Sequence, residues 1–85
     1  MPYITKEDRE YYIKTLAESK KAGISTAGDL NYLITKLCLQ YLDECGECYK
    51  THNEIMGVLE SAKQEWYRRQ VSPYEDTKIA VNGDM

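Results

Sequence analysis

Apolar residues recur at every third or fourth position through three long segments of this 85-residue chain. This spacing places them on one face of an α-helix, which has 3.6 residues per turn. A half-buried strand would instead alternate apolar and polar residues, and no segment of the sequence does so. A chain of this length also has room for only one domain. The sequence therefore predicts an all-α fold in a single domain over residues 1–85.

Residues with capping chemistry predict where the first two helices begin and end. Thr5, followed by acidic residues, is typical of a helix start, and Gly23 is typical of a helix end. Ser25 or Thr26 predicts the start of the second helix. From Leu30 onward the apolar stripe of that helix widens beyond one face, which is typical of a central helix. The predicted ranges are residues 6–22 and 27–43.

The second half of the chain predicts one long helix and one short helix. Thr51 to Glu54 form the pattern of a capping box, with Thr51 as the N-cap. Ser72-Pro73 then predicts a break, because proline lacks a backbone donor and disfavours helical angles in the residue before it. Glu75, three residues after Ser72, completes a second capping pattern. The predicted ranges are residues 51–71 and 73–81, with Asn82-Gly83 ending the last helix.

Short loops between these helices favour antiparallel neighbours. We therefore predict a compact antiparallel three-helix bundle with a short C-terminal fourth helix or an ordered tail. Its core would contain the apolar stripes of the two long central segments. The first stripe comprises Leu30, Leu33, Ile34, Leu37, Cys38 and Tyr41, and the second comprises Ile55, Val58, Leu59, Ala62 and Trp66.

Composition and charge exclude several classes of protein. Eleven Lys and Arg against fourteen Asp and Glu give a net charge of -3, which argues against a general nucleic-acid binder. The N-terminal segment lacks the apolar region of a signal peptide. No apolar run approaches the roughly 18 residues that a membrane span needs. We therefore expect a cytoplasmic protein with three reduced cysteines.

The cysteines and the single histidine form the pattern C-x6-C-x2-C-x3-H. Four such ligands suit tetrahedral zinc, so the sequence allows a metal site. Three features oppose it: one cysteine lies on an apolar helix face, no second histidine follows, and the helices supply a core without metal. A thioredoxin-like redox pair is opposed by the absence of a strand pattern. The interpretation we favour is a glycine-containing turn. The four residues are Cys38, Cys45, Cys48 and His52.

Nothing in the sequence forms a nucleophile, base and acid set, so we expect no enzyme activity and no cofactor. The segment GISTAGD offers one alternative to pure capping. Hydroxyl groups, free amides and the positive end of a helix dipole can hold an anion such as a nucleotide. A glycine there would let a ligand approach the backbone, and an arginine would add charge. The residues of this candidate anion site are Ser25, Thr26, Gly28 and Arg69.

Aromatic composition points to a protein-binding surface. The chain has eight Tyr, one Trp and no Phe, and half-buried Tyr are common at interfaces. Trp66 lies on the predicted apolar stripe, and core packing is the interpretation that we favour for it. We expect the contact face to contain Tyr67, Arg68 and Tyr74, with Tyr11 and Tyr32 as additions.

Four segments carry a resemblance to a family of small uncharacterised proteins of bacteria and their phages. They are MPYITKEDRE, AGDLNYLITKL, GVLESAKQEWYRR and VSPYEDTKIAVNGDM, and the CGEC turn lies outside the likeness. The resemblance carries over no activity and no assigned site. It implies a small accessory role on a host protein, including inhibition of a defence system.

The sequence thus favours a non-enzymatic helical module that binds a protein and associates with copies of itself. One alternative is an oligomeric protein that sequesters an anionic small molecule at the start of the second helix. The other alternative is a small zinc-stabilised helical domain.

Overall fold

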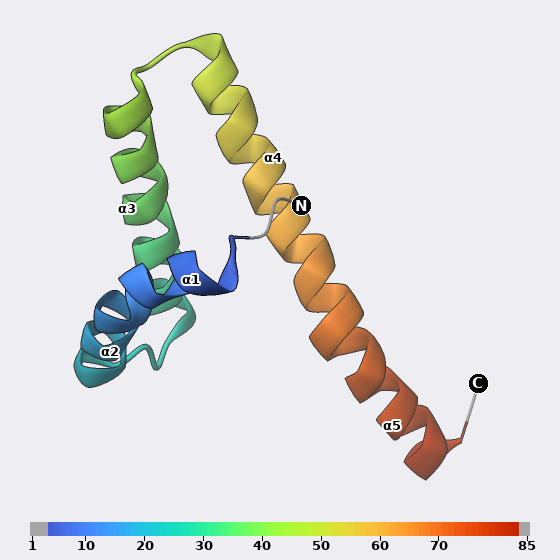
Figure 1. The fold of residues 1–85 in the computed structure, drawn as a ribbon. Helices are drawn as coiled ribbons and strands as arrows, with labels where there is room; N and C mark the ends of the chain where they lie inside the picture. Colours follow the sequence, from blue (N-terminus) through green and yellow to red (C-terminus); the bar gives the residue numbers. More distant parts are fainter. Residues whose placement is uncertain (1–3, 84–85) are drawn as a thin grey trace. The chain divides into compact units, whose positions relative to one another are not determined.

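The computed structural model describes residues 4–83, and within this range it contains helices and turns but no strand. The prediction of an all-α protein is therefore confirmed. The chain divides into two units, one reaching Glu47 and one running from Cys48, and each is described by itself. Figure 1 traces the elements in chain order.

The first unit contains a short helical series and one long helix. The series comprises α1 (Lys6–Arg9), the 3-10 turn η1 (Glu10–Tyr12) and α2 (Ile13–Ala22), and the long helix is α3 (Ala27–Cys45). The Thr5 hydroxyl accepts a hydrogen bond from the amide of Asp8, and Gly23 ends α2 at a φ of 89°. Both caps agree with the sequence prediction.

The start of α3 has a complete capping box. The amide of Asp29 donates to the Thr26 hydroxyl, and the Asp29 carboxylate accepts from the Thr26 amide. Thr26 is therefore the N-cap, one of the two residues that the sequence allowed. Gly46 ends the helix at a φ of 86°, a backbone angle that glycine adopts without steric cost.

The second unit begins with α4 (Tyr49–Trp66), which starts earlier than expected. Its N-cap is Cys48, so the prediction that Thr51 caps this helix was wrong. Thr51 instead lies inside the first turn with 3% of its surface exposed, and its Oγ1 lies 3.3 Å from the Cys48 Sγ. The Thr51 hydroxyl has this local partner while its backbone is helical, so hydrogen bonding does not require Thr51 to adopt the extended angles of an N-cap.

The predicted break at Ser72-Pro73 is absent. The π-helical turn η2 (Tyr67–Val71) joins α4 directly to α5 (Ser72–Asn82), and Figure 1 shows α4 and α5 as one continuous helical ribbon. Ser72 has helical angles and caps nothing; its amide donates to the carbonyl of Tyr67, five residues back. Proline removes one donor and its ring crowds the carbonyl four residues earlier. A wider turn accommodates both effects without ending the helix.

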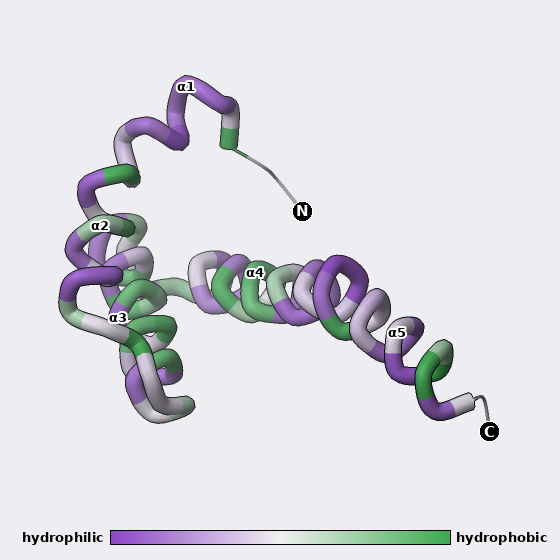
Figure 2. The backbone as a smooth tube through the Cα atoms, turned by 90° about the horizontal axis from the view of Figure 1, so that it is seen from below, coloured by the Kyte–Doolittle hydropathy of each residue, from purple (hydrophilic) through white to green (hydrophobic). Residues whose placement is uncertain are grey.

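Apolar residues lie on these helices without becoming buried. Across residues 4–83 no hydrophobic side chain is buried. Figure 2 shows hydrophobic segments in α3, in α4 and again near the end of α5. A side chain exposed in the whole chain is at least as exposed in its own unit. Neither unit therefore encloses a hydrophobic core by itself.

The long helices also differ from membrane spans. Within the described part of the chain, no helix combines the length and the apolar character needed to cross a bilayer.

Candidate interaction surface

The junction of α4 and η2 carries the most distinctive surface of the second unit. An open hollow of about 700 Å³ lies there, and its lining includes Trp66, Tyr67, Arg68 and Val71. Tyr67 and Arg68 were predicted contact residues, and the structure places both at this hollow. Trp66 is 64% exposed, so its own unit does not enclose the ring. Trp, Tyr and Arg are the residues that most often dominate binding energy at interfaces.

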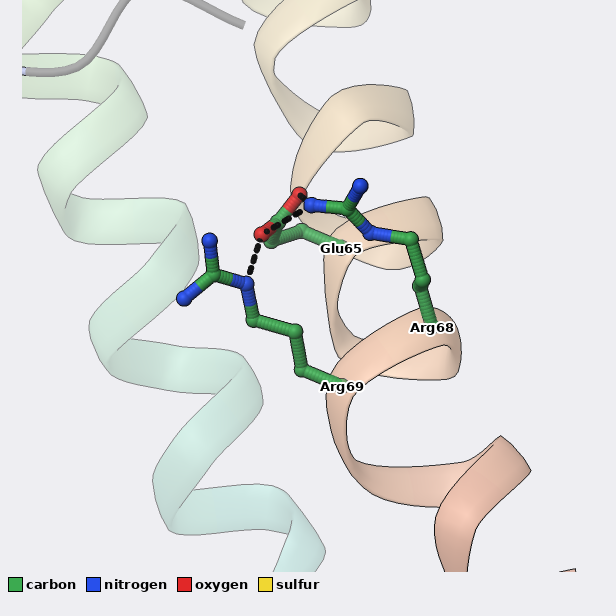
Figure 3. A network of polar contacts seen from close by, with 3 residues as sticks. All are labelled: Glu65, Arg68 and Arg69. Atoms are coloured by element: carbon green, nitrogen blue, oxygen red, sulfur yellow. Dashed lines mark hydrogen bonds and ion pairs between the residues drawn. The ribbon is translucent and has the colours of Figure 1, made fainter.

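One glutamate holds both arginines of the junction. The Arg68 Nη2 donates to both carboxylate oxygens of Glu65, at 3.0 and 3.1 Å, and the Arg69 Nε also pairs with Glu65. Figure 3 shows the two guanidinium groups converging on this carboxylate. Glu65 has only 22% of its side chain exposed, whereas both arginines are exposed. The network holds the two guanidinium groups together on one turn of the helix, beside the hollow.

A second polar contact spans the π turn. The Tyr67 hydroxyl is hydrogen-bonded to the Glu75 carboxylate, and this bond raises the pKa of Tyr67, with the nearby charges of Glu75 and Asp76 acting in the same direction. The phenol therefore stays protonated and keeps donating at neutral pH.

The other predicted contact residues are not among the residues that line the hollow. Tyr74 is on α5, 61% exposed, with the Lys78 ammonium 5.5 Å from its ring centroid. In the first unit, Tyr11 is in η1, and Tyr32 is on α3 with Lys36 placed over its ring in the same way. All three rings are exposed. Cation–π contacts of this kind hold an exposed ring in place and leave one face for a partner.

The predicted anion site is already filled by the protein's own carboxylate. Asp29 Oδ2 accepts from the amides of Ser25 and Thr26, both at 3.2 Å. These bonds, led by the one from the Ser25 amide, lower the pKa of Asp29. An external anion would have to compete with this negative charge. Gly28 lies next in the first turn of α3, and Arg69 belongs to the other unit, where it pairs with Glu65.

The predicted metal ligands belong to α3 and to the start of α4. Cys38 and Cys45 are both on α3, where seven residues at a rise of about 1.5 Å each separate them by roughly 10 Å. Two thiolates on one zinc ion lie within about 4 Å of each other, because each Zn–S bond is about 2.3 Å. The two cysteines therefore cannot share an ion while α3 stays helical. His52 lies in the first turn of α4. No group of three or more His, Cys, Asp or Glu gathers at a potential metal site within residues 4–83.

Cys48 has an environment of its own at the start of α4. A hydrogen bond from the Thr51 hydroxyl, followed by bonds from the backbone amides of Thr51 and Lys50, lowers the pKa of its thiol. Amides at a helix N-terminus stabilise a thiolate in this way. Cys38 is half-buried and Cys45 is exposed.

Sequence reasoning missed two features of this surface. Trp66 was assigned to the core because its helical spacing matches the apolar stripe, and spacing alone does not say whether a stripe is covered. Glu65 was not singled out, although its spacing of three and four residues from two arginines is a signal for helical ion pairs.

Comparison with known proteins identifies a family. The model of the family Domain of unknown function (DUF6899) matches residues 1–85. No curated protein and no solved structure matches the chain.

Proposed function

Because the chain belongs to that family, whose description assigns no activity, we propose a function from the surface itself: a non-enzymatic helical module that binds protein, beginning with copies of itself. The observation that carries this proposal is the exposure of the apolar faces. Large hydrophobic side chains are exposed on α3, α4 and α5, and no hydrophobic side chain within residues 4–83 is buried. Covering such faces is the main favourable contribution to folding and association.

The compact antiparallel bundle belongs to this proposal as the assembled state. Helices with an apolar stripe are stable in water when another helix covers the stripe. In the assembly, helices of a second copy contribute to that cover. The exposed junction of Trp66, Tyr67 and Arg68 supplies the aromatic and basic side chains that such a contact uses. A cytoplasmic location and an action on a host protein rest on the sequence and on the resemblance alone.

The double variant Tyr67→Ala/Arg68→Ala tests the proposal. It removes a ring and a guanidinium from the hollow while leaving a good helix former at both positions. We expect the dissociation constant for self-association to rise about tenfold or more, because truncating an interface residue of this kind commonly costs over 1 kcal/mol. Sedimentation equilibrium over a range of concentrations measures the effect, and circular dichroism checks that the helices persist.

The matched control is Tyr49→Ala/Lys50→Ala at the start of α4. Lys50 forms an exposed ion pair with Glu54, just as Arg68 does with Glu65, so both double variants lose a ring and a helical ion pair. We expect the control to associate like the wild type. If both double variants had the same dissociation constant, the junction of α4 and η2 would not be part of the contact face.

Native mass spectrometry of the purified wild type separates the alternatives. A mass equal to a multiple of the chain supports self-association. A co-purified nucleotide in the spectrum would favour the sequestering protein, and bound zinc would favour the metal-stabilised domain.

A further inference from the structure

We draw no further inference here: the strongest candidate, the apolar face of α4 and α5 on either side of the π turn η2, belongs to one unit by itself, and nothing in the structure shows what covers it.

Discussion

Helix α3 and the long helix formed by α4, η2 and α5 follow different rules. Helix α3 begins at the capping box of Thr26 and Asp29 and ends at Gly46, and both bounds depend on groups within four residues. The long helix begins one turn before its predicted cap and continues through Pro73. The difference shows that a sequence signal sets a helix end when it satisfies backbone groups there. A proline removes one backbone donor, and a change from an α-helical to a π-helical turn can accommodate this loss without ending the helix.

The strongest test of this contrast compares two glycines. Gly46 ends α3 with φ 86° and ψ 142°, a region that side chains other than glycine adopt only with strain. We expect Gly46→Ala to lower the free energy of unfolding by about 1–3 kcal/mol. Gly57 lies inside α4, where an added Cβ meets no atom within 4 Å. We expect Gly57→Ala to raise the free energy of unfolding by about 0.5–1 kcal/mol.

Urea denaturation followed by circular dichroism measures both glycine variants at one protein concentration. The matched pair holds the chemical change constant, so only the backbone conformation differs. Equal effects of the two substitutions would contradict the assignment of Gly46 as the end of α3.

A smaller difference in the free energy of unfolding is expected between substitutions at the cap of α3 and at the predicted cap of α5. Thr26→Ala removes a side-chain acceptor that the Asp29 amide uses, and we expect it to cost about 0.5–2 kcal/mol of unfolding free energy. Ser72→Ala changes a residue inside a continuous helix, and we expect less than about 0.5 kcal/mol. The same denaturation experiment measures both. A loss at Ser72 as large as that at Thr26 would restore the predicted break.

The smallest effect is a pH dependence confined to α3. The pKa of Asp29 is lowered below its ordinary value of 3.8 by bonds that its ionised form accepts. A carboxyl with a lower pKa in the folded state contributes stability above its unfolded pKa. That contribution is lost as the pH falls through 3.8 toward the lower folded value.

We therefore expect acid to weaken the wild type more than Asp29→Asn over this pH range. Stability measured at several pH values in both chains gives the difference, in which the titration of the other carboxyl groups cancels. Parallel pH curves for the two chains would show that the capping box makes no ionic contribution.

The candidate surface was predictable only in part. Tyr67 and Arg68 were identified from their residue types, and the structure places both at one hollow. The direction of Tyr74 relative to Trp66 was not predicted from spacing, because Pro73 was interpreted as a break in the helix and not as a residue that a wider turn accommodates. The occupation of the predicted anion site by the Asp29 carboxylate was also not predicted. A capping carboxylate and an external anion would accept hydrogen bonds from the same amides.

The sequence by itself determined the helical class, the first cap at Thr5, a cap at Ser25 or Thr26 and the glycine ends of α2 and α5. These features depend on hydrogen bonds and backbone angles within a few residues, so neighbouring side chains suffice to specify them. Only the tertiary structure decided that the helix passes Pro73 through a π turn and that Trp66 is exposed within its own unit. Both depend on how turns and faces combine over many residues, which periodicity does not encode.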